Sequence, residues 1–152
     1  MLSLPRVTGI AIDALRKQLE TVPARLLALA EADTSEALRS GGWSRKQILG
    51  HLLDSCINNH YRIVRAVLEG GYSGPSYAQE DWVAVHRYDL LSWPGIVSLW
   101  TAHNNLFLHL VEQIGDEHTS VECSGGEEQC TLSGRLDDYT SHMGHHLSQI
   151  LS

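Results

Sequence analysis

The sequence predicts an all-α domain, a four-helix bundle with a long loop between helices two and three. Four segments carry apolar residues at helical spacing, one connection between them is much longer than the rest, and no internal repeat or low-complexity tract interrupts the pattern. The chain has 152 residues, of which 43% are hydrophobic, so it is long enough to bury one core. We therefore predict a single domain over residues 1–152.

The first helix is expected over residues 10–30. Pro23 lies inside this apolar pattern, and because proline lacks an amide hydrogen it is expected to kink or divide the helix. The next segment, 33–42, is polar and ends in two glycines. This composition predicts a loop with room for one short turn.

The second helix begins at Ser44. Gln47 follows three residues later, which is the spacing of a capping box, and Gly70-Gly71 ends the apolar pattern. Residues 72–91 have no sustained period, so they form the long loop of the prediction. Long loops in compact domains often carry function.

The third helix is expected to begin near Ser92 or Trp93, because Pro94 is tolerated in a first helical turn, and to end near Ile114. Residues 116–129 predict irregular structure or a short hairpin, and a fourth helix begins at Thr131 or Ser133. Four long helices indicate an antiparallel bundle, although the loop 72–91 is longer than up-and-down packing requires.

Composition excludes several classes of function. The net charge of −7 argues against general binding to nucleic acid or to an anionic membrane, and no apolar run approaches the ~20 residues of a membrane span. Three cysteines are a sparse and odd set, which favours a reducing compartment, so we predict a cytoplasmic protein. Cys56 is expected in the core. Cys123 and Cys130 flank a turn that could bring them together, but a reducing cytosol opposes a disulfide.

Nine residues are histidine, the commonest protein ligand for transition metals. In the last helix His142 and His146 are four residues apart and flank the apolar face, whereas His145 points to solvent. Two imidazoles at this spacing can share one metal ion. The glutamate of the zinc-protease motif is absent, because Met143 follows His142.

A third ligand must come from another helix, and the candidates are His51, His60 and His103. Periodicity predicts that His60 and His103 are the more buried. His51 instead shares a polar strip with Ser55, Asn58, Asn59 and Arg62. This strip carries little charge, so it could line a wet cavity inside the bundle. Periodicity alone leaves the choice open.

Several motifs in order resemble the DinB-like metalloprotein superfamily over residues 10–151. They are Trp43-Ser44 at a helix start, Gln47-Ile48-Leu49-Gly50-His51-Leu52-Leu53-Asp54-Ser55, Tyr61-Arg62-Ile63, and Asp138-Tyr139-x-x-His142-x-x-His145-His146-x-x-Gln149-Ile150. Residues 77–82 are similar to an acidic and aromatic stretch of that family. The resemblance implies a bundle of the DinB-like type that binds one divalent metal through His51, His142 and His146. It also implies that the protein can form a homodimer.

Three imidazoles and a water make an open metal site, typical of catalysis. The resemblance implies a thiol-dependent transferase, using a low-molecular-weight thiol, or a hydrolase, either acting on a small molecule. The alternative is a non-catalytic metal-binding or stress-response module. Three imidazoles accept nickel, zinc, cobalt, copper or iron, with nickel and zinc foremost.

The other expected site residues surround this metal. Glu80 is the candidate general base, with Asp81 beside it. Asp54 could accept a hydrogen bond from an imidazole or form a surface salt bridge, and Arg62 could hold a substrate carboxylate. The remaining expected pocket residues are Gln79 and Gln149.

Overall fold

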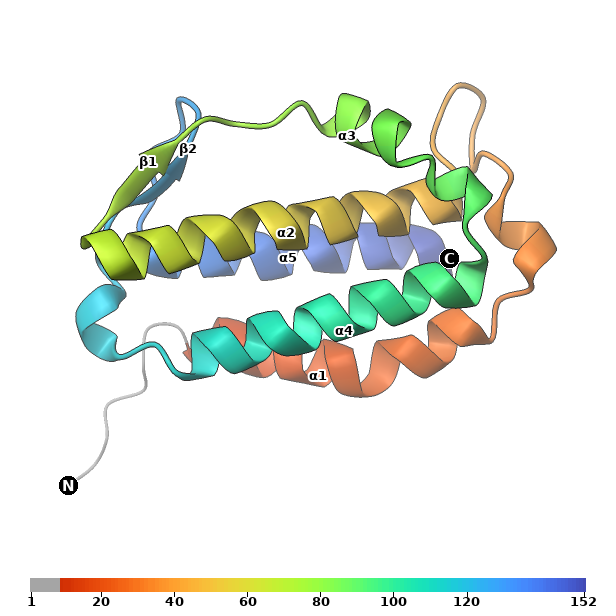
Figure 1. Ribbon diagram of the computed structural model, residues 1–152. Helices are drawn as coiled ribbons and strands as arrows, with labels where there is room; N and C mark the ends of the chain where they lie inside the picture. Colours follow the sequence, from red (N-terminus) through yellow and green to blue (C-terminus); the bar gives the residue numbers. More distant parts are fainter. Residues whose placement is uncertain (1–8) are drawn as a thin grey trace.

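The computed structural model describes residues 9–152, in which four long helices form a bundle (Figure 1). The helices are α1 Gly9–Leu27, α2 Arg45–Glu69, α3 Gln79–His86, α4 Trp93–Glu112 and α5 Leu132–Leu151, and the strands are β1 Tyr72–Gly74 and β2 Cys123–Gly125. Short 3-10 turns lie at Glu31–Thr34, Tyr88–Leu90 and Asp116–His118. No helix in the described part of the chain is both long and apolar enough to cross a membrane.

Local hydrogen bonds set the helix ends much as the sequence predicts. The Ser44 side chain accepts from the Gln47 amide, and the Gln47 side chain accepts from the Ser44 amide at 2.9 Å, so the capping box is confirmed. Gly70 ends α2 in the left-handed conformation, with φ of 73°. Thr131 caps α5 by accepting from the Gly134 amide.

The division of the first helix at Pro23 is wrong, because α1 is one helix from Gly9 to Leu27. A proline removes one backbone hydrogen bond, whereas Val22 and Leu26 on either side of it are buried in the core. Their packing holds the helix together through Pro23.

The order of helices around the bundle differs from the predicted antiparallel arrangement. Both α4 and α5 contact α1 on one side and α2 on the other. In Figure 1, α2 and α4 run in the same direction, opposite to α1 and α5. The prediction of an antiparallel bundle is therefore wrong for the neighbours α2 and α4.

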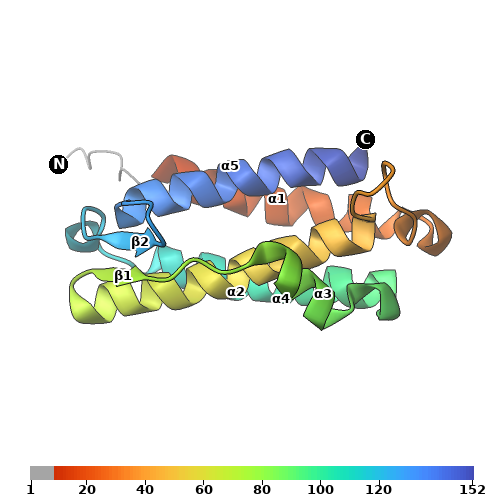
Figure 2. The same cartoon turned by 90° about the horizontal axis from the view of Figure 1, so that it is seen from above.

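This parallel pair explains the length of the connection between α2 and α4. The 25 residues of α2 span about 37 Å at about 1.5 Å per residue, and the chain must return over that distance before α4 begins. The connection passes over α2, as the view from above shows (Figure 2), and both β1 and α3 contact α2. We call residues 70–92 the crossover.

The missing periodicity predicted that the crossover is a plain loop. The structure shows instead that it contains β1 and α3. Strand β1 pairs in parallel with β2, which precedes α5, with Tyr72 opposite Cys123 and Gly74 opposite Gly125. Gly126, with φ of 67°, then turns the chain, and Gly125 bridges to Glu128. The predicted turn at these glycines is therefore confirmed, whereas the strand pairing was not predicted.

Candidate metal centre

Three histidines from two neighbouring helices form a cluster. His51 lies in the second turn of α2, and His142 and His146 lie one turn apart on α5. One ligand nitrogen from each ring lies within 4.8 Å of the other two. The centres of the imidazole rings are 5.0 Å apart for His51 and His142, 5.0 Å for His51 and His146, and 4.6 Å for His142 and His146. We call this set the histidine triad.

The spacing of the nitrogen atoms fits a transition metal. The Nε2 atoms of His51 and His142 lie 3.1 Å apart. Two nitrogens on a tetrahedral metal, each at about 2.0–2.1 Å from it, are about 3.3 Å from one another. Small side-chain movements would therefore suffice for the triad to hold a metal ion.

The triad has one closed side and one accessible side. His51 is only 1% exposed, and the Trp43 ring lies 5.1 Å from its imidazole. His142 and His146 are half-buried. The accessible side of the triad is therefore at His142 and His146, each of which lines one of the cavities described below.

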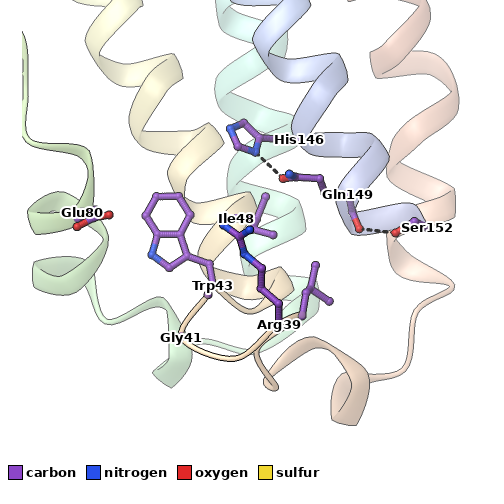
Figure 3. Close-up of a pocket in the computed structure, with 10 residues that line it drawn as sticks. Arg39, Gly41, Trp43, Ile48, Glu80, His146, Gln149 and Ser152 are labelled. Atoms are coloured by element: carbon purple, nitrogen blue, oxygen red, sulfur yellow. Dashed lines mark hydrogen bonds between the residues drawn. The ribbon is translucent and has the colours of Figure 1, made fainter.

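Gln149 orients one of the imidazoles. Its Oε1 lies 2.8 Å from Nδ1 of His146, drawn as a dashed line in Figure 3. Because an amide oxygen only accepts hydrogen bonds, Nδ1 donates and the lone pair of Nε2 is left for a metal. Gln149, which was expected in the pocket, therefore contacts a candidate ligand through the ring nitrogen that would not bind the metal.

The environment keeps two of the imidazoles neutral. Burial, followed by the nearby charges of His142 and His146, lowers the pKa of His51 to about 4. Burial, followed by the charges of His146 and His145, lowers the pKa of His142 to about 4. Neutral imidazole is the form that binds a metal.

These pKa values predict a loss of stability in mild acid. The metal-free folded protein resists protonation of His51 and His142 below their ordinary pKa of 6.5, whereas the unfolded chain takes up these protons. Stability is thus fully present above pH 6.5 and falls toward pH 4. One pKa unit is worth about 1.4 kcal/mol, and partial exposure of His142 reduces this, so we expect a loss of ~2 kcal/mol between pH 7 and pH 5.

Urea unfolding with a chelator present measures this loss. The combined His51→Gln and His142→Gln variant is the control, and its free energy of unfolding should change less over the same pH range. An equal change in both proteins would show that other groups cause the loss.

His60 and His103 lie outside the triad, and the prediction that they are more buried than His51 is wrong. Both are half-buried, and His60 lies 6.1 Å from the ring of Phe107 on α4. Three residues of the polar strip, Ser55, Asn59 and Arg62, are buried and line a cavity together with residues of α5 and the crossover. The strip therefore lines the interior, as the wet-cavity interpretation had allowed.

Two cavities meet the triad. The first, of about 510 Å³, is lined by His146, Gln149, Trp43 and Glu80 among others (Figure 3). The second, of about 370 Å³, reaches His142. Its other lining residues come from α2, α5, the crossover and the turn between β2 and α5: Ser55, Asn59, Arg62, Tyr77, Gln79, Glu128, Arg135, Asp138 and Tyr139.

The acidic residues predicted for the site separate in the structure. Glu80 lies in the first turn of α3 and lines the first cavity, at the opposite side from His146 and Gln149 in Figure 3. Asp81 instead lines a different hollow, together with Trp82 and His86. Of the two carboxylates, Glu80 is the one that shares a cavity with the triad.

Asp54 attaches the crossover to α2. It is fully buried, and its Oδ1 accepts from the Tyr88 hydroxyl at 2.6 Å and lies 3.0 Å from Nδ1 of His86. Of the two alternatives for Asp54, the surface salt bridge is wrong because the residue is buried, whereas the contact with an imidazole is present but involves His86 and not a residue of the triad. Burial raises the pKa of Asp54.

Sequence reasoning missed His86, Tyr88 and Arg135. His86 is absent from the expected site residues, and its side chain is 41% exposed, but one ring nitrogen contacts Asp54. Tyr88 lies in a segment without periodicity. Arg135 is charged and near a helix start, so only its burial, with Nε bonded to the carbonyl of Cys123 in β2, distinguishes it from a surface residue.

Comparison with known proteins gives one consistent result. A sequence model of the DinB superfamily matches residues 14–150. A protein of Oceanobacillus iheyensis, whose name proposes a metal-dependent hydrolase, is 27% identical over 154 aligned positions, which cover 96% of this chain and 87% of the relative. YfiT of Bacillus subtilis, whose name proposes the same activity, is 26% identical, with 87% of this chain and 78% of the relative covered.

The fold has a close counterpart among solved structures. The structure of YfiT from Bacillus subtilis, described as having an unusual four-helix bundle topology, aligns with a TM-score of 0.80. The alignment covers 99% of this chain and 87% of the other at 20% identity. The similarity extends over the bundle and its connections, so the parallel pair α2 and α4 belongs to a fold already observed.

Proposed function

Because this chain belongs to the DinB superfamily, we propose that it is a metal-dependent hydrolase that acts on a small molecule. The observation that carries the proposal is the histidine triad, three imidazole nitrogen ligands whose accessible side meets two cavities. The names of the related proteins support hydrolysis over other metal chemistry.

Each residue of the triad has its own part in holding the metal. His51 is the buried ligand, fixed by packing in α2, and His142 and His146 complete the set from α5. Gln149 holds the His146 ring in the ligating tautomer. A bound nickel or zinc ion would supply Lewis acidity, lowering the pKa of a coordinated water or thiol toward neutrality.

Glu80 is the proposed proton acceptor. Hydrolysis requires a base that removes a proton from the attacking water. Among the residues that line the first cavity, Glu80 is the one with a carboxylate. Trp43 lies in the same cavity and shields one side of His51 from water.

Glu80→Gln is expected to lower kcat by roughly 10²–10⁴-fold without changing the metal content, because general-base catalysis contributes about that much. Asp81→Asn is the matched control, since Asp81 is the next residue in the same helical turn but lines another hollow. Equal activity of Glu80→Gln and wild type would remove Glu80 from the mechanism.

The function itself is tested on untagged protein, because a histidine tag binds metal. Elemental mass spectrometry should find about one divalent metal per chain. The loaded protein is then assayed with a panel of small esters and amides, with and without a low-molecular-weight thiol. Turnover only with thiol would identify a transferase instead, and metal binding without turnover across the panel would favour the non-catalytic module.

A further inference from the structure

Two buried arginines face the second cavity. Arg62 extends from α2 and Arg135 from the first turn of α5, and each is only 8% exposed. Arginine is rarely buried to this degree without a carboxylate partner. The partners of these two guanidinium groups therefore need to be identified.

Neither arginine forms an ion pair with a carboxylate anywhere in residues 9–152. Arg62 Nη2 donates to the carbonyl of Pro75 at 3.2 Å, and Arg135 Nε donates to the carbonyl of Cys123 at 3.1 Å. Nη2 of Arg135 is buried and has no hydrogen-bond partner. These neutral carbonyls leave two positive charges uncompensated at the wall of one cavity.

The two charges also repel each other. Burial, followed by the charge of Arg135, lowers the pKa of Arg62. Glu128 and Asp138 line the same cavity, but both are exposed at its rim. Two like charges buried together destabilise the folded protein unless an anion binds between or beside them.

The surrounding residues hold Arg62 in position. Its guanidinium lies 5.9 Å from the centre of the Tyr77 ring. On another side it packs on the backbone of Gly125, where an added Cβ would come within 2.7 Å of Arg62 Cζ. The pairing of β1 with β2 thus provides a glycine surface that accommodates a side chain of α2.

One further group in this cavity lacks a partner. Asn59 donates from Nδ2 to the carbonyl of Ser55 at 2.8 Å, which leaves its buried Oδ1 as an unpaired acceptor. The cavity therefore offers unpaired donors on Arg135 and an unpaired acceptor on Asn59. A carboxylate or phosphate with a neighbouring hydroxyl or amino group would satisfy both.

We propose that the second cavity binds the anionic group of the substrate, a carboxylate or phosphate held by Arg62 and Arg135. The inference rests on the proposed function, because the same cavity reaches His142, so a ligand held at the arginines extends toward the triad. The volume of about 370 Å³ fits a small molecule. The substrate class is thus a small, anionic, hydrolysable molecule.

The test is isothermal titration of untagged protein with inorganic phosphate and, separately, with succinate, at constant ionic strength. Wild type should bind at least one of them saturably at one site per chain. Arg62→Gln and Arg135→Gln should each weaken that binding roughly tenfold or more, because each removes a charged donor while glutamine retains a polar one. The anion that binds more tightly distinguishes phosphate from carboxylate substrates.

Two further variants distinguish a specific anion-binding site from nonspecific electrostatic attraction. Arg65→Gln removes the same charge one turn along α2, where Arg65 pairs with Glu69 at the surface, and it should bind like wild type. Gly125→Ala keeps every charge but displaces the Arg62 guanidinium, so it should bind more weakly. Circular dichroism verifies that each variant is folded.

Absence of saturable binding of both anions to folded wild type would overturn the inference, as would an equal loss in Arg65→Gln and Arg62→Gln. Metal content is measured on the same samples. Metal bound without anion binding would refute the anion site and leave the proposed function standing. Anion binding by a protein that takes up no metal would refute the proposed function and leave the anion site standing.

Discussion

Replacing His51 with alanine is expected to abolish stoichiometric metal binding. His51 is the buried ligand of the triad and the one that α2 provides, so its loss leaves two imidazoles on α5. Two ligands on one helix hold a divalent metal far more weakly than three converging ones. Elemental mass spectrometry should show a fall from about one metal per chain to almost none, and His146→Ala should behave alike.

Two matched controls accompany this result. His60→Ala changes a half-buried histidine of the same helix, and His145→Ala changes the exposed neighbour of His146. Both should retain the metal. If the His60→Ala variant contained no metal while the His51→Ala variant retained it, the triad would not be the metal site.

Replacing Gly50 with alanine is expected to destabilise the protein by about 2–3 kcal/mol, the cost of overpacking a core. A Cβ at this position would lie 2.1 Å from the ring of Tyr88, which is itself buried. The ring cannot move away easily, because its hydroxyl donates to Asp54 at 2.6 Å. We expect the crossover to lift from α2, with faster hydrogen exchange over residues 79–90.

Gly144→Ala is the matched control for this substitution. Gly144 also lies inside a long helix, but the nearest atom to an added Cβ is Nε2 of Gln18 at 3.5 Å, an ordinary contact. Alanine favours helix over glycine by about 1 kcal/mol, so Gly144→Ala should be neutral or stabilising. Urea unfolding compares the two, and equal stability would show that Tyr88 does not restrict Gly50.

Local interactions account for what the sequence determined by itself. The capping box of Ser44 and Gln47, the left-handed Gly70 and the Thr131 cap act within a few residues, so pattern alone predicted the ends of α2 and the start of α5. The i, i+4 spacing likewise brings His142 and His146 together on one helix.

Contacts between distant segments decided the rest. The burial of His51, not of His60, depends on which side of α2 faces α5 and lies beneath the crossover, and an uncharged polar strip does not reveal this. The arginine pair and the attachment of Asp54 to Tyr88 join residues far apart in the chain. The parallel course of α2 and α4 is likewise tertiary, because helical periodicity specifies which face of a helix is buried but not which neighbour buries it or in which direction that neighbour runs.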